Sequence, residues 1–173
     1  ARAGDGTNRL LLGNFSQSGP PPVPPPYIAR WNGSSWQAMS GLSDPVTTVA
    51  RVGTHLYAAG LSSGSNALFD WNGAGWTSVP AYDDSLLSFA SFTALASYGG
   101  ALIAAGDFTR LGGVTMLGIG RFDGTNWTSL AGVAPNGAID YIGIDQGALR
   151  IAGQFTSRPG PPAAPWTALR LPP

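Results

Sequence analysis

Few residues in this chain could carry acid–base or metal chemistry. There is no cysteine, glutamate or lysine, and His55 is the only histidine. His55 stands at a turn, where an exposed or hydrogen-bonded histidine is the ordinary case. Asp83 and Asp84 are adjacent and could bind Ca²⁺ or act as paired carboxylates, although such a pair is more often a solvated loop. We therefore predict no catalytic residue, no metal site and no cofactor.

Three Asn-x-Ser/Thr sequons offer a second kind of chemistry, the attachment of glycans. They begin at Asn14, Asn32 and Asn126. Sequons are used only in a protein that a glycosylating cell secretes, and they arise by chance in β proteins rich in Asn, Ser and Thr. The three asparagines are kept as candidate glycosylation sites.

Composition excludes several classes of protein. The nine basic residues are all Arg and the nine acidic residues are all Asp, so the formal net charge is zero. We expect no nucleic-acid partner, because only 10% of the residues are charged. We expect no membrane insertion, because no apolar run approaches the roughly 20 residues that a span needs. Without Lys and Glu, and with 25 Gly and 15 Pro, the chain lacks common helix formers and is rich in turn residues. An all-β chain is predicted.

A four-fold repeat organises the sequence. Its marker is a short apolar strand that ends in glycine, at Gly13, Gly60, Gly106 and Gly153, which are spaced 47, 46 and 47 residues apart. Periods of roughly 40 to 50 residues with several short strands per unit indicate β-propeller blades. We treat residues 1–173 as one domain. Its repeats span about residues 9–53, 54–99, 100–146 and 147–173.

The third unit predicts four strands, at residues 92–98, 101–105, 117–122 and 127–130. An Asn-Gly or Asp-Gly pair joins the last two strands of the first three units, and aromatic residues flank it as a cross-strand pair. These aromatics could stack on sugar rings, but their recurrence favours packing between blades. A second element, Gly-x-Phe-Thr/Ser and its close variants, is predicted to fill the gap between adjacent blades. Its phenylalanines are Phe15, Phe108 and Phe155.

These motifs resemble kelch-type propeller repeats. The closest likeness is to the divergent kelch-like repeats of bacterial secreted proteins and of fungal cortical-marker ectodomains, and residues 27–39 carry it most clearly. The likeness extends from about Leu10 to Gln154, although the family's double glycine is Ala-Gly here. The resemblance implies a propeller-like array of four-stranded antiparallel blades. It also implies that residues 46–52, 92–98 and 139–145 are innermost strands, and it suggests an extracellular or cell-surface location.

The number of blades is a problem for a complete ring. Residues 1–8 are too polar and Gly-rich to predict a first strand, so the chain is expected to begin at the second strand of a blade. The fourth unit has only residues 166–171 as a further strand candidate. About 3.5 to 4 blades result, whereas propellers have about four to eight. The chain could be part of a longer protein, a small closed ring, or a subunit whose open edges pair with copies of itself. We rank a fragment or an assembled subunit above an autonomous ring.

One face of the predicted array collects the irregular segments. Turns after the first and third strands are short, whereas the second-to-third connections and the links between blades fall on the opposite face. Irregular loops on a rigid scaffold are where binding usually resides. The proline tract there could be a docking arm or a stiff loop that covers a blade edge. The candidate binding residues are Pro20, Pro21, Pro22, Pro24, Pro25, Pro26, Tyr82, Asp83 and Asp84.

The sequence leads to three hypotheses for function. The first is a non-enzymatic extracellular or surface module that binds a protein or glycan through its irregular face. The second is a structural subunit of an ordered assembly, held together by edge strands and proline-rich loops. The third is the non-catalytic part of a larger secreted enzyme.

Overall fold

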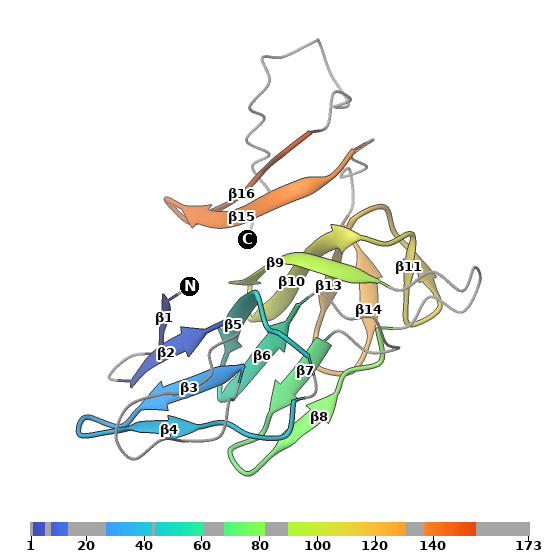
Figure 1. The fold of residues 1–173 in the computed structure, drawn as a ribbon. Helices are drawn as coiled ribbons and strands as arrows, with labels where there is room; N and C mark the ends of the chain where they lie inside the picture. The colour runs from blue at the N-terminus through green and yellow to red at the C-terminus, as the bar shows by residue number, and fades with distance from the viewer. Residues whose placement is uncertain are drawn as a thin grey trace.

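The structure is a computed structural model that describes residues 2–5, 8–13, 27–42, 44–60, 68–81, 90–130 and 137–154. Throughout these residues the regular secondary structure is β-strand, without a helix (Figure 1). The strands form antiparallel sheets of two to four strands. The prediction of an all-β chain is therefore confirmed for the described residues.

One main sheet forms for each period of the sequence, and each sheet begins one strand before the repeat bounds given above, so a unit is counted from here on from its first strand. In the first three units, the hydrogen-bonded order of the four main strands is their order along the chain. The first unit contains β1 (Arg2–Asp5), β2 (Asn8–Leu12), β3 (Ile28–Trp31) and β4 (Trp36–Ala38). The second contains β5 (Thr48–Val52), β6 (His55–Ala59), β7 (Leu68–Trp71) and β8 (Trp76–Ser78). The third contains β9 (Ser91–Tyr98), β10 (Ala101–Asp107), β13 (Ile119–Phe122) and β14 (Trp127–Ser129). The fourth is described as β15 (Ile139–Asp145) and β16 (Ala148–Gly153).

The first unit differs from the prediction because it has a first strand. β1 pairs with β2 along its whole length, from Arg2 opposite Leu11 to Asp5 opposite Asn8. An antiparallel ladder is made by backbone N–H and C=O groups, so a polar segment can pair with an apolar strand. The expectation that the chain begins at the second strand of a blade is wrong.

The third unit contains a small hairpin that the sequence did not reveal. β11 (Arg110–Leu111) and β12 (Val114–Thr115) pair with each other within the connection between β10 and β13. Two-residue strands are too short to show an alternating pattern, so the sequence predicts only a loop there. The predicted strand at residues 166–171 lies outside the described residues.

Each interior sheet packs one face on the preceding unit and the other on the following unit. In β6, Leu56 and Ala58 belong to an apolar cluster shared with the first unit, whereas Tyr57 and Ala59 belong to one shared with the third. Successive residues of a strand point to opposite faces. The marker strands are therefore apolar at consecutive positions because both of their faces are buried.

The first strands of the second, third and fourth units lie side by side, with β9 between β5 and β15 (Figure 1). The Leu95 amide donates to Thr48 Oγ1 over 3.1 Å, and Thr93 Oγ1 donates to the Ile139 carbonyl over 2.5 Å. The bonded residues are 47 and 46 positions apart. The sequence period is thus the step from one sheet to the next.

Three of the marker glycines are required by a close approach of two backbones. A Cβ atom on Gly60, Gly106 or Gly153 would lie 2.0, 1.8 or 2.1 Å from a carbonyl oxygen. That oxygen lies at the start of the unit's first strand or just before it, so no side chain fits at the glycine. The oxygens belong to Pro45, Ser91 and Ala138, respectively.

A tryptophan in the fourth strand joins its sheet to the preceding unit. Trp76 Nε1 donates to the Met39 carbonyl over 3.1 Å, and Trp127 Nε1 donates to the Pro80 carbonyl over 2.7 Å. Met39 directly follows the fourth strand of the first unit, and Pro80 is the second residue after that of the second unit. These contacts support packing between sheets as the role of the repeated tryptophans.

The hairpin between the third and fourth strands is built in the same way in three units. Asn32, Asn72 and Asp123 each accept two backbone N–H bonds through Oδ1, over 2.8 to 3.1 Å. The glycine that follows each of them has a φ of 101° to 104°, as the Asn-Gly and Asp-Gly pairs predict. The flanking rings pair across the strands with centroids 5.0 to 5.5 Å apart. These ring pairs are Trp31–Trp36, Trp71–Trp76 and Phe122–Trp127.

Candidate functional site

Most of the predicted site residues lie outside the described residues. This holds for the candidate binding residues Pro20, Pro21, Pro22, Pro24, Pro25, Pro26, Tyr82, Asp83 and Asp84, and for the sequon at Asn14. The sequon asparagines Asn32 and Asn126 are described, and both are exposed in hairpins of different units. The Asn32 side chain accepts the backbone N–H groups of its own turn, so it has a local structural role.

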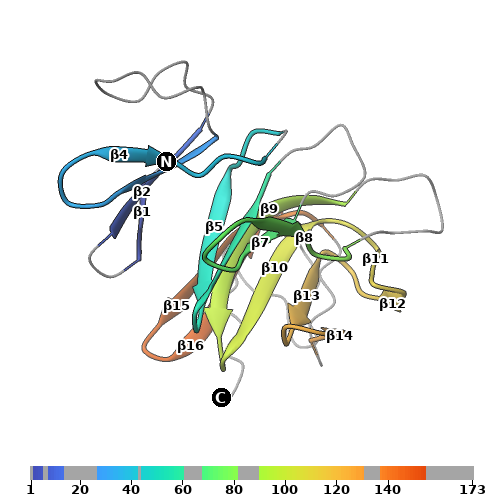
Figure 2. The ribbon, with the colours of Figure 1, turned by 90° about the horizontal axis from the view of Figure 1, so that it is seen from below.

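The described sheets have two unlike ends. At the turn end, short turns join the first strand to the second and the third strand to the fourth. Figure 2 shows the β5–β6, β9–β10 and β15–β16 turns toward the same end of the molecule. At the opposite connection end lie residues 106–118, which join β10 to β13, and residues 137–138, which lead into β15. Each end has a pocket.

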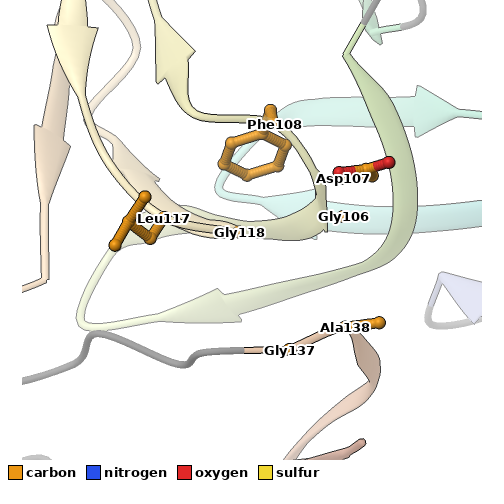
Figure 3. A pocket seen from close by; sticks show the side chains of 7 residues that line it. All are labelled: Gly106, Asp107, Phe108, Leu117, Gly118, Gly137 and Ala138. Atoms are coloured by element: carbon orange, nitrogen blue, oxygen red, sulfur yellow. The ribbon is translucent and has the colours of Figure 1, made fainter. Parts of the chain in front are cut away.

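The pocket at the connection end has a volume of about 330 Å³ (Figure 3). Its wall comes from the β10–β13 connection and from the segment that enters the fourth unit. It therefore lies where two units meet. The lining residues are Gly106, Asp107, Phe108, Leu117, Gly118, Gly137 and Ala138.

Backbone hydrogen bonds hold this connection in shape. The Gly106 amide donates to the Gly118 carbonyl over 3.0 Å, and the Gly118 amide donates to the Phe108 carbonyl over 2.9 Å. Gly118 has a φ of 67°, and a Cβ there would lie 3.2 Å from the Gly106 carbonyl oxygen. The positive φ favours glycine at this position, so the wall of the pocket is bare backbone.

Phe108 anchors this connection in the apolar core. Its side chain is 6% exposed, and its ring centroid lies 5.6 Å from that of Phe92. It belongs to the apolar cluster between the second and third units, which confirms the prediction that this phenylalanine fills the gap between neighbouring units. The equivalent Phe15 and Phe155 lie outside the described residues.

The chemistry of the pocket is mostly apolar, with one charge. Leu117 is 48% exposed, one of only three large hydrophobic side chains that are exposed in the described residues. Asp107 is the single ionisable residue in the lining, and it is exposed. Figure 3 shows Gly137 and Ala138 on the side of the opening that faces away from Phe108. This arrangement can hold an apolar group against Leu117 and one cationic or hydrogen-bond-donating group near Asp107.

The pocket at the turn end has a volume of about 350 Å³. Turns from the second and third units meet there. Its lining residues are Val52, Gly53, Thr54, His55, Tyr57, Gly100, Phe122, Asp123 and Gly124. All of these positions belong to the repeated turns or to the strands beside them, and three separate turns contribute.

His55 and Asp70 form a pair at this pocket. His55 Nδ1 lies 2.7 Å from Asp70 Oδ2, and the two side chains are 50% and 17% exposed. The His55 ring stacks on Tyr57 with centroids 6.1 Å apart. Burial, and secondarily the Asp70 carboxylate, raise the pKa of Tyr57 above its usual value. The hydrogen-bonded turn histidine expected from the sequence is present, and it links β6 to β7.

The pair by itself does not complete a catalytic site. Asp70 can fix the orientation of the His55 ring, as the carboxylate of a triad does. The lining contains no cysteine or serine, and Thr54 carries its only aliphatic hydroxyl, for which no hydrogen bond to His55 is present. Within the described part of the chain, no cluster of three or more metal-ligating side chains is present. No helix in that part has the length and apolar character of a membrane span.

Sequence reasoning missed the residues that line the connection-end pocket. The sequence assigns the second-to-third connections to the irregular face, but it directs attention to the proline tract rather than to Asp107 and Leu117. The spacing of Gly106 and Gly118 is one signal that could have found the pocket, because the two glycines flank the second-to-third connection of the third unit. Leu117 gave no signal, since exposure of a leucine cannot be read from its neighbours.

Comparison with known proteins assigns the chain to no family. No protein-family model matches the chain, and no curated protein matches it.

Proposed function

We propose that the chain is an extracellular or cell-surface recognition module of the kelch-like propeller type, and that it is not an enzyme. It binds its partner through the connection end of the sheets. The extracellular location and the kelch-like character rest on the sequence resemblance given above.

The propeller arrangement is supported by the way the units pack. Four-stranded antiparallel sheets follow one another face to face, and their first strands lie side by side at a step of 46 or 47 residues. A propeller arranges its blades around an axis in this manner, with the first strands innermost.

The connection-end pocket is the observation that carries the binding proposal. Its exposed groups, Asp107 and Leu117, come from a second-to-third connection whose sequence differs from unit to unit, although Gly106 and Phe108 belong to the repeat. The turn-end pocket is built from turns that every unit repeats. A repeated element is explained by the scaffold. An exposed Leu117 above a bare backbone wall has no such explanation, and exposed apolar side chains in concave sites are typical of ligand contacts.

A protein segment fits this pocket better than a glycan. Glycan sites generally present an open aromatic face to the sugar ring, and the only aromatic residue in the lining, Phe108, is 6% exposed. Leu117 and the exposed Asp107 instead match a peptide that carries an apolar side chain next to a basic one.

Selection of peptides from a displayed library on the immobilised chain tests the proposal. The dissociation constant of a selected peptide is measured for the wild type, for Leu117→Ser and for Ile144→Ser. Ile144 is a matched control, because it is 45% exposed and lies on β15 away from the pocket. Leu117→Ser is expected to weaken binding by about tenfold or more, the effect of removing a central apolar anchor. Ile144→Ser is expected to leave it within about twofold.

Two results contradict the proposal. One is equal weakening by both substitutions. The other is full binding after the loops at residues 20–26 and 80–88 are replaced together with Leu117. A parallel glycan array distinguishes the two ligand classes. If the chain binds a glycan and Leu117→Ser abolishes that binding, the connection-end pocket is the binding site but its ligand is a glycan and not a peptide.

A further inference from the structure

The marker strands reveal a rule for how neighbouring sheets meet. The residue three places before the marker glycine points toward the following unit, and the residue four places before it points toward the preceding unit. At each interface these two positions share one apolar cluster. The pairs are Leu10 with Leu56, Tyr57 with Leu102, and Ile103 with Leu149.

The two outward faces of the described array break this rule. On the outward face of the first unit, the residue four places before the marker glycine is Arg9, and it is exposed. On the outward face of the fourth unit, the residue three places before the marker glycine is Arg150, whose side chain is 36% exposed. At every interior interface both positions hold large apolar side chains.

The first unit's outward face is otherwise built like an interior one. It carries Trp31 and Trp36, equivalent to Trp71 and Trp76, which face the first unit from the second. Trp76 donates its Nε1–H to a carbonyl of the preceding unit, whereas Trp36 has no such acceptor among the described residues. The aromatic half of an interface is present, and Arg9 departs from it. The register, with Arg2 opposite Leu11 and Gly4 opposite Arg9, places Arg2 on the same side of the sheet as Arg9.

Stacking two copies head to tail would bring Arg150 of one copy against Arg9 of the next. Asp145 lies 3.2 Å from Arg150 and offsets its positive charge. The positive charges of Arg9 and Arg2 would remain uncompensated in the interface. A desolvated, uncompensated charge strongly opposes association.

We propose that Arg9 and Arg150 prevent the outward faces of two copies from stacking, and that the Arg9 face fits a partner sheet of the same repeat type that carries a carboxylate opposite Arg9. Interfaces commonly obtain specificity in this way: like charges repel the wrong partner, and opposite charges attract the right one. The proposal goes beyond recognition at the connection end, because it concerns different faces of the sheets.

Charge reversal tests the proposal by analytical ultracentrifugation over a wide concentration series. The wild type is expected to remain monomeric. Arg150→Glu supplies one carboxylate and frees that of Asp145, so two carboxylates would face Arg9 and Arg2. Its self-association is expected to be at least about tenfold tighter than that of the wild type and to weaken at high salt. Arg9→Glu, which reverses the other face, is a second variant whose association is expected to be weaker because Asp145 already occupies Arg150.

The double variant Arg9→Glu with Arg150→Glu is the matched control, because it carries both substitutions but restores like charges. It is expected to return to a monomer. The proposal is overturned if the wild type already stacks through these faces, if Arg150→Glu and Arg9→Glu both stay monomeric, or if the double variant associates as tightly as Arg150→Glu. Far-UV circular dichroism verifies that each variant keeps its β structure.

Discussion

The turn end and the connection end of the sheets border pockets of similar size, about 350 and 330 Å³, but they are made of different kinds of residue. The turn end is assembled from turns that recur in each unit with nearly the same hydrogen bonds. The connection end is assembled from a segment with its own small hairpin, β11–β12. Two pockets of equal size thus have different origins.

The difference separates the scaffold from the candidate site. A residue that every unit repeats is explained by the packing of one sheet on the next. A residue that only one unit carries needs another explanation, and Leu117 at the connection end is such a residue. Substitutions at repeated positions should therefore affect stability, whereas substitutions at Leu117 should affect binding alone.

The largest effect is expected at a marker glycine. Gly106→Ala places a Cβ 1.8 Å from the Ser91 carbonyl oxygen, so the two backbones must separate, at a cost of about 3 kcal/mol or more. Gly75→Ala is the control, because nothing lies within 4 Å of its Cβ and its φ is not positive. Urea denaturation should show a change within about 0.5 kcal/mol for the control. Equal destabilisation by the two variants would show that the marker glycines do not hold the sheets at contact distance.

The next effect is expected at the tryptophan that joins two units. Trp127→Phe removes the Nε1–H donor to the Pro80 carbonyl and leaves a gap in a site that is 5% exposed. A loss of about 2 kcal/mol in unfolding free energy is expected. Trp36→Phe, at the equivalent position on an outward face, should cost less than about 1 kcal/mol. Urea unfolding of both variants measures the difference, and equal costs would contradict the interface role.

A smaller effect is expected in the repeated hairpin. Asn72→Ala removes the side-chain oxygen that accepts the Ala74 and Gly75 amides. Because the hairpin is exposed and water can replace the lost acceptor, a cost of about 1 kcal/mol is expected. Thermal unfolding followed by tryptophan fluorescence reports it. No change in the unfolding temperature would mean that the flanking ring pair alone holds the turn.

The third hairpin makes this contribution dependent on pH. The backbone amides of Asn126 and Thr125 donate to the Asp123 carboxylate and lower its pKa. The pKa is lower in the folded state than in the unfolded one, so the stabilisation is complete above the unfolded value of about 4 and is lost as pH falls through the folded value. Asp123→Asn keeps the acceptor without titrating. The unfolding curves of wild type and Asp123→Asn should diverge below about pH 4, and parallel curves would be evidence against this account.

The smallest effect on stability is expected at the candidate site. Leu117→Ser should change the unfolding free energy by less than about 0.5 kcal/mol, because Leu117 is 48% exposed. The same variant is expected to lose binding. A large loss of stability would assign Leu117 to the scaffold and remove the distinction between the two ends.

The parts of the fold that were predicted from the sequence are those that repeat. Recurrence located the marker strands, the ring-flanked hairpins and Phe108, since each has equivalents in other units. β1 was missed because its pairing depends on backbone groups of β2 rather than on apolar side chains of its own. β11 and β12 were missed because they are two residues long.

The candidate site was harder to predict than the fold. Asp107 and Leu117 are ten positions apart in the sequence, and Ala138 follows another strand, so only the folded backbone brings them together. The proline residues at 20–26 and Tyr82, Asp83 and Asp84 remain predictions, since they lie outside the described residues. The sequence predicted only that His55 is an exposed or hydrogen-bonded turn residue. Its partner Asp70 could not be predicted, because 15 residues separate the two.

The measurement that tests the central claim most directly is an NMR titration of the ¹⁵N-labelled chain with the tightest selected peptide. The account predicts amide shift changes at Asp107, Leu117, Gly118 and Ala138, at the connection end, and none at Gly53, Gly100 and Gly124, at the turn end. Shift changes confined to the turn end, or spread equally over both ends, would contradict it.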